Sequence, residues 1–134
     1  MFIVGYSGDD VNEYTLSTGF DVSSASFVDS FSVSSQDSEP RGLAFSNDGT
    51  KMFIVGNAGD TIEEYTLSTG FDVSSASYTR SMSINSYDND PRGIAFNIDG
   101  TRMFISGQQN NQIHEFTLGS LKWIHEFDYF VDLK

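Results

Sequence analysis

Two arginines, Arg41 and Arg92, are the residues of this chain best suited to bind a ligand, because they occupy equivalent places in two acidic segments. Each follows a proline, and an aspartate precedes each at the same spacing: Asp37 before Arg41 and Asp88 before Arg92. A guanidinium group can bind a carboxylate or a phosphate through two parallel hydrogen bonds. The pattern predicts anion binding at both arginines. The alternative is that each arginine pairs with an acid beside it.

A further carboxylate, Asp60, lies in a predicted turn and joins Asp37 and Asp88 in the predicted ligand-binding set. Carboxylate oxygens are the ligands that Ca²⁺ prefers, and Ca²⁺ takes six to eight of them. The spacing of these acids fits no calcium-binding loop, so we predict no metal ligands and no cofactor, with Ca²⁺ as the open alternative. His114 and His125 have no nucleophile or metal ligand at a useful spacing, and no catalytic residues are predicted.

A tandem repeat explains why these residues recur. The segment 1–5, Met-Phe-Ile-Val-Gly, returns unchanged at 52–56 and with one substitution at 103–107, which is a spacing of 51 residues each time. Between 1–51 and 52–102, 33 of the 51 aligned positions are identical. A period of this length is typical of repeat arrays, solenoids and propellers.

One repeat unit has the pattern of four short antiparallel strands, expected over 41–46, 51–56, 62–67 and 78–84. Asn-Asp-Gly-Thr at 47–50 predicts a hairpin turn between the first two. In the second strand Met52 and Ile54 alternate with Phe53 and Val55, so both faces are apolar. We expect neighbouring sheets to cover that strand on both sides.

A sheet that is apolar on both faces and recurs along the chain can bury itself only against its own copies. Radial repetition of four-stranded sheets is the β-propeller. We therefore predict an all-β chain of about 2.7 propeller blades. The expected blades are 1–39, lacking the first strand, then 40–90, and then 91–134 with a divergent last strand. A β-solenoid is the alternative, although its coils are usually shorter.

The segment 40–56 resembles the repeats of the YVTN, NHL and WD-like propeller families. Those repeats commonly run Pro-x-Gly-hydrophobic-Ala-Phe-Ser-x-Asp-Gly-Thr-x-hydrophobic before a β-branched strand. The segment 91–106 repeats the pattern, with departures at Asn97 and Ile98, while the Gly-His and Trp-Asp signatures of WD repeats are absent. The resemblance implies the propeller fold. Some relatives in these families are hydrolases, lactonases or lyases, which implies an enzymatic alternative.

Fewer than three blades do not close a ring, because propellers typically have about 4–8. We therefore expect the chain to associate with itself, as a homodimer with about six blades or as a homotrimer with about eight or nine. The alternative is that the sequence is a piece of a longer propeller. Trp123, Phe127 and Phe130 in the divergent tail are the predicted interface residues, since aromatic side chains are enriched at protein interfaces.

The net charge of −12 argues against nucleic acid and against an anionic membrane surface as partners, because both bind clustered basic residues. No cysteine is present, so disulfides and thiolate metal sites are excluded. No apolar run reaches the ~20 residues that span a bilayer, and no signal peptide is recognisable, so we expect a soluble protein of unassigned location. The predicted function is a non-catalytic binding or scaffold module with a glycan or protein ligand. The alternative is a hydrolase or lactonase-like enzyme with its site in the central funnel.

Overall fold

The computed structural model describes residues 1–118, 131 and 132, and these residues form three antiparallel sheets. Blade 1 has the strand order β1 (Phe2–Gly5), β2 (Asp10–Leu16), β3 (Ala25–Ser32). Blade 2 has the order β4 (Pro40–Phe45), β5 (Lys51–Gly56), β6 (Thr61–Leu67), β7 (Ala76–Ser83). Blade 3 has the order β8 (Pro91–Phe96), β9 (Arg102–Gly107), β10 (Ile113–Thr117), β11 (Val131–Asp132).

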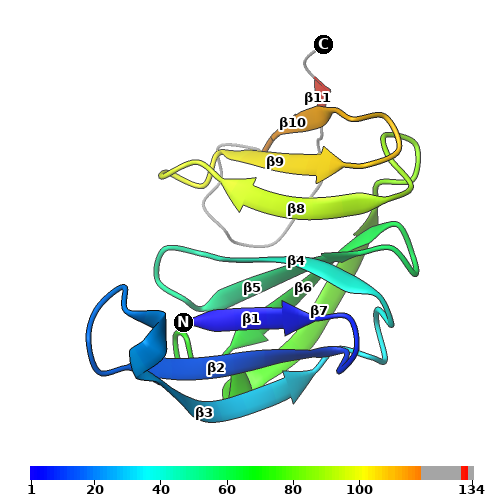
Figure 1. Ribbon diagram of the computed structural model, residues 1–134. Helices are drawn as coiled ribbons and strands as arrows, with labels where there is room; N and C mark the ends of the chain where they lie inside the picture. The colour runs from blue at the N-terminus through cyan, green and yellow to red at the C-terminus, as the bar shows by residue number, and fades with distance from the viewer. Residues whose placement is uncertain (119–130, 133–134) are drawn as a thin grey trace.

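The three sheets are stacked face to face, with blade 2 between blade 1 and blade 3 (Figure 1). Consecutive strands within each sheet are hydrogen-bonded neighbours, as in a meander, and the chain moves to the next sheet only after the last strand. The first strands of neighbouring blades, β4 and β8, lie against each other along one edge of the stack. The all-β architecture of antiparallel propeller blades that the repeat predicts is confirmed.

Strand β5 shows why the blades must stack. Its side chains alternate, so that Met52 and Ile54 enter the core between blades 1 and 2, while Phe53 and Val55 enter the core between blades 2 and 3. All four side chains are buried. The predicted coverage of this strand on both faces is confirmed. Burying each of these apolar side chains contributes about 1.5–3 kcal/mol to stability, and the contribution requires both neighbouring sheets.

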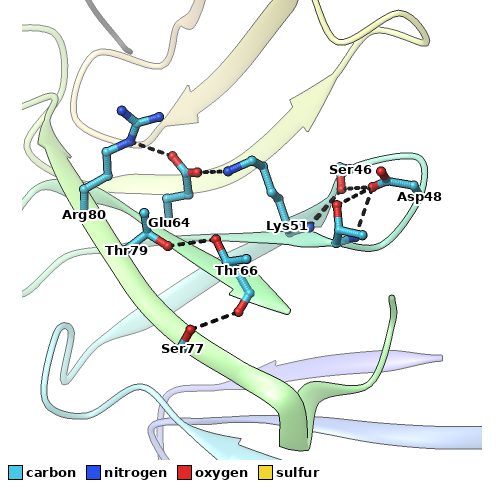
Figure 2. A network of polar contacts seen from close by, with 9 residues as sticks. Ser46, Asp48, Lys51, Glu64, Thr66, Ser77, Thr79 and Arg80 are labelled. Carbon is cyan, nitrogen blue, oxygen red and sulfur yellow. Dashed lines mark hydrogen bonds and ion pairs between the residues drawn. The ribbon is translucent and has the colours of Figure 1, made fainter. Parts of the chain in front are cut away.

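The turn between β4 and β5 follows the Asn-Asp-Gly-Thr signal. Gly49 has φ +71°, a left-handed conformation that costs glycine little. The Asp48 carboxylate accepts hydrogen bonds from the Ser46 hydroxyl and from both the amide and the hydroxyl of Thr50 (Figure 2). These bonds favour the charged form, and they hold the pKa of Asp48 below its usual value.

The connections before β3 and β7 contain short 3-10 helices, which the sequence pattern did not predict. They are η1 (Val22–Ser24) and η2 (Val73–Ser75). The Asp72 side chain accepts the amide of Ser74, as a helix N-cap residue does, and Asp21 does the same in blade 1. Val73 is thereby held in the core between blades 1 and 2. The correction follows from side-chain capping, which hydrophobic periodicity does not reveal.

A glutamate recurs at the equivalent position of β2, β6 and β10: Glu13, Glu64 and Glu115. The structure gives each a different partner. Glu64 is buried and pairs with Lys51 and with Nε of Arg80, which lies 2.8 Å away (Figure 2). Glu115 pairs with Arg102, and Glu13 accepts the backbone amide of Val73 at 3.2 Å. The glutamate has a structural contact in each blade, but its partner depends on which side chains or backbone groups lie beside it.

Candidate functional site at the loop edge of the blades

Two connections that meet at one edge of the stack carry the predicted ligand-binding residues. The β3–β4 connection lies against the β5–β6 turn, where the amide of Asn57 donates to the Glu39 carbonyl at 3.1 Å. The β7–β8 connection lies in the same way against the β9–β10 turn, where the amide of Gln108 donates to the Asp90 carbonyl at 2.9 Å. The repeat therefore builds the same loop pair twice.

Asp37 and Asp88 are buried in these loop pairs, and each accepts a hydrogen bond from a backbone amide of its own loop. Asp37 Oδ1 accepts the amide of Glu39 at 2.6 Å, and Asp88 Oδ1 accepts the amide of Asp90 at 2.8 Å. A Cβ atom at Gly56 would overlap the Asp37 carboxylate, which shows how closely the two loops meet. Burial raises the pKa of Asp37 above its ordinary value. Both carboxylates thus shape the loops, and neither faces solvent.

Each arginine pairs with the acid two residues before it. Arg41 Nη2 lies 3.2 Å from Glu39 Oε2, and Arg92 Nη2 lies 2.8 Å from Asp90 Oδ2. The predicted alternative of a local ion pair is therefore present in both loops. The Nε atom of each arginine is buried and has no hydrogen-bond partner within the described residues. The Tyr6 ring lies 4.7 Å from the Arg41 guanidinium carbon, in cation–π contact.

The backbones that carry the two arginines are in direct contact. A Cβ atom placed on Gly42 would lie 3.0 Å from the carbonyl oxygen of Arg92 and 2.9 Å from the Cα atom of Gly93. A side chain at Gly42 would hold β4 and β8 apart, so glycine after the arginine permits this approach. Arg41 and Arg92 therefore start from adjacent backbone positions on neighbouring blades. Both side chains are partly exposed.

Asp60 is a turn residue in the structure. Its φ of +51° lies in the left-handed region, where aspartate and asparagine are tolerated better than other side-chain-bearing residues. Its carbonyl accepts the amide of Ile84 at 2.8 Å, which ties the β5–β6 turn to the end of β7. Asp9 has the same φ region and accepts the amide of Val33 in the same way. The backbone conformation thus accounts for the recurrence of a short acidic residue here.

Glu63 is a buried carboxylate that the sequence pattern did not single out. Thr61 donates to its Oε1 at 2.7 Å, and the side chain is almost fully buried. Burial raises the pKa of Glu63 above its ordinary value, and the charge of Asp37 adds to that effect. The available signal was a carboxylate that shares one face of its strand with Tyr65, two residues later. Its burial makes it a structural carboxylate of the core between blades 1 and 2.

Within residues 1–118, 131 and 132, no three His, Cys, Asp or Glu side chains are grouped to hold a metal ion. No helix in this part of the chain is long and apolar enough to cross a membrane. The predicted interface residues Trp123, Phe127 and Phe130 lie outside the described residues. The candidate site within the described residues therefore consists of the two loop pairs and their arginines.

No protein-family model and no curated protein matches this sequence. Solved structures do resemble it. A candidate 6-phosphogluconolactonase from Bacteroides fragilis matches with a TM-score of 0.65 at 12% identity, covering 99% of this chain and 34% of that one. A candidate 6-phosphogluconolactonase from Bacteroides uniformis matches with a TM-score of 0.62 at 14% identity, covering 90% and 34%.

The periplasmic gluconolactonase of Pseudomonas aeruginosa has a TM-score of 0.56 at 13% identity, covering 85% of this chain and 31% of that one. This chain therefore spans about a third of the length of the structures it resembles. At such identities the likeness establishes the fold, and it does not transfer an activity. The chain is an all-β protein of propeller-like blades. Its closer relation to YVTN or NHL repeats stays a prediction.

Proposed function

We propose that the blades of this chain belong to a lactone-hydrolysing propeller in which Arg41 and Arg92 bind the anionic group of a sugar-acid lactone. The observation that carries the proposal is the pair of partly exposed arginines on adjacent strands, each held by a carboxylate two residues earlier. The lactonases among the similar structures support the choice of reaction. This activity was the alternative to a non-catalytic module in the sequence analysis, and the similar structures favour it.

The charges of the site suit an anionic ligand at short range. Each guanidinium group already shares one nitrogen with a carboxylate, so it is held in place before a ligand arrives. The cation–π contact with Tyr6 adds a second restraint on Arg41. The net charge of −12 opposes the approach of an anion from a distance. We therefore expect weak binding at low ionic strength and an increase in association as salt screens the repulsion.

The test is lactone hydrolysis followed by proton release, with gluconolactone and 6-phosphogluconolactone as substrates and the spontaneous rate subtracted. Replacing Arg41 or Arg92 by glutamine should raise KM for the phosphorylated lactone more than for the neutral one. Arg102→Gln is the matched control, because Arg102 pairs with Glu115 away from the two loop pairs. A rate equal to that of buffer for both lactones would refute the enzymatic proposal.

A non-catalytic binding module is the second candidate, and the near-identity of the repeats favours it. Equal loop pairs repeated around an axis suit a multivalent ligand, because each site adds to avidity without a new contact. A glycan array and a set of basic and acidic peptides would identify such a ligand. Tyr6→Ala should weaken binding there, since Tyr6 is exposed and lies over Arg41. Absence of signal in both screens would leave this candidate without support.

A further inference from the structure

Blade 1 exposes on its free side residues whose equivalents in blade 2 are less exposed and pack toward blade 1. We call the side of blade 1 that faces away from blade 2 the end face, defined by Met1, Ile3, Phe20 and Val22. The equivalent residues of blade 2 are Met52, Ile54, Phe71 and Val73, and they pack toward blade 1. Ile3 is 46% exposed and Val22 is 71% exposed, whereas Ile54 and Val73 are 0% exposed.

Phe20 is the clearest sign that the end face is built for a contact. Its φ of +62° lies in the left-handed region, which is unfavourable for a bulky residue, and its side chain is fully exposed. Phe71 has the same conformation, with φ +63°, but its ring packs against Phe2 and Phe45 across the junction of blades 1 and 2. The conformation is therefore compensated in blade 2 and uncompensated in blade 1.

The opposite end of the same chain carries the matching surface. Blade 1 covers blade 2 with Phe2 and Val11, and it accepts the amide of Val73 with Glu13. The equivalent residues of blade 3 are Phe104, Ile113 and Glu115. Ile113 is 73% exposed, whereas the equivalent Ile62 of blade 2 is 1% exposed against blade 3. The outer side of blade 3 thus carries the same kinds of residue that blade 1 uses to cover blade 2.

We propose that the end face binds blade 3 of a second copy of this chain, head to tail, with the contacts that join blades 1 and 2. In this arrangement Glu115 of the second copy accepts the amide of Val22, as Glu13 accepts that of Val73. Blade 1 has three strands of about six residues each, so its face measures roughly 20 Å by 14 Å. Two such junctions in a closed pair bury about 1,100 Å², which exceeds the roughly 1,000 Å² expected of a biological interface.

This junction joins two blades without Arg41 or Arg92, so it does not depend on the proposed function. Sedimentation velocity of the full chain, from low to high micromolar concentration, tests it. We expect a mass two or three times the 14.8 kDa of one chain. A single species of 14.8 kDa at every concentration would overturn the proposal.

Matched variants identify the surfaces. Val22→Asp should raise the dissociation constant by about tenfold or more, because a charge would be buried in the junction. Val28→Asp is the control, since Val28 is exposed in blade 1 and its equivalent, Thr79, is exposed in blade 2. Circular dichroism should show that both variants fold. Equal weakening of association by both variants would contradict the assignment of the end face.

Mixing two variants tests the head-to-tail direction. Val22→Asp damages only the end face, and Ile113→Asp damages only the outer side of blade 3. Each variant alone should be monomeric, and an equimolar mixture should form a heterodimer through the one junction that is intact in the pair. If Ile113→Asp alone still dimerises, two end faces meet each other. If the mixture stays monomeric, the two surfaces do not meet. Either result overturns the proposal.

Discussion

Blade 1 and blade 2 have nearly the same sequence and very different surroundings. Val73 is 0% exposed and Val22 is 71% exposed, although both begin a 3-10 helix that the preceding aspartate caps. The repeated sequence therefore gives the same local structure in both blades, since the same caps, turns and strands recur. The burial of equivalent side chains differs, because it depends on whether another sheet packs against them. The comparison shows that a blade is a complete local structure and an incomplete core.

The largest expected difference between the blades is in the cost of removing a core side chain. Ile54→Ala should lower the free energy of unfolding by about 2–5 kcal/mol, because Ile54 is buried between blades 1 and 2. Ile3→Ala, at the equivalent position of blade 1, should cost less than about 1 kcal/mol in the dissociated chain. Urea unfolding measures both. Equal costs at a concentration where the chain is monomeric would contradict the comparison.

The glutamates of the third strands should rank by their surroundings. Glu64→Ala should cost about 3–5 kcal/mol, because it leaves Lys51 and Arg80 without their shared buried carboxylate. Glu13→Ala should cost about 1–2 kcal/mol, through the amide of Val73 that it leaves unpaired. In the dissociated chain Glu115→Ala should cost less than about 1 kcal/mol, since its pair with Arg102 is partly exposed.

Chemical denaturation of the three variants tests this ranking. Double mutants sharpen it, because Glu64→Ala combined with Arg80→Ala should cost less than the two single changes added together. Three equal costs would mean that the glutamate makes an equivalent contact in every blade.

Two glycines at the contact of β4 with β8 offer a third comparison. Gly42→Ala should destabilise the chain by about 1–3 kcal/mol, because the added Cβ meets the backbone of Arg92 and Gly93 and a methyl group of Val55. Gly93→Ala should cost less, since its Cβ meets only the hydroxyl of Ser106, which can rotate away. Thermal unfolding of the two variants measures the difference. A larger cost at Gly93 would contradict the observed geometry.

The smallest expected effect is a dependence of stability on pH. The pKa values of Asp37 and Glu63 are raised in the folded state by burial. The folded chain therefore binds more protons than the unfolded chain above the ordinary values of 3.8 and 4.5. Stability should fall as the pH rises through this window toward the raised pKa values, and the loss persists at neutral pH. Calorimetry at pH 5 and pH 7 should show the higher melting temperature at pH 5.

Substitutions of single carboxylates show which of them cause the pH dependence of stability. Glu63→Gln should reduce it and should raise stability at pH 7 by about 1 kcal/mol or less, because it removes a buried charge and keeps the acceptor for Thr61. Asp48→Asn should instead lower stability at pH 7, because the hydrogen bonds that lower the pKa of Asp48 stabilise its charged form. Its contribution is present above 3.8 and is lost as the pH falls below that value. An unchanged pH dependence in Glu63→Gln would exclude Glu63 as its source.

Most of the fold could be predicted because the evidence was local or periodic. The turn at Gly49 follows from its neighbours in sequence, and the two-sided burial of β5 follows from the alternation of Met52 and Phe53. The site was less predictable. Arg41 and Arg92 could be found by their repetition, but their partners Glu39 and Asp90 depend on how the loops fold. The burial of Glu63 depends on blade 1, which the strand pattern alone does not place.

The sequence by itself determined the repeat, the strands, their turns and their apolar faces, because each rests on residues a few positions apart. Only the tertiary structure decided which of these faces are covered. The physical reason is that burial is a relation between two surfaces, and the second surface comes from another blade. Identical residues such as Ile3 and Ile54 therefore differ in exposure, although nothing within their own strands distinguishes them.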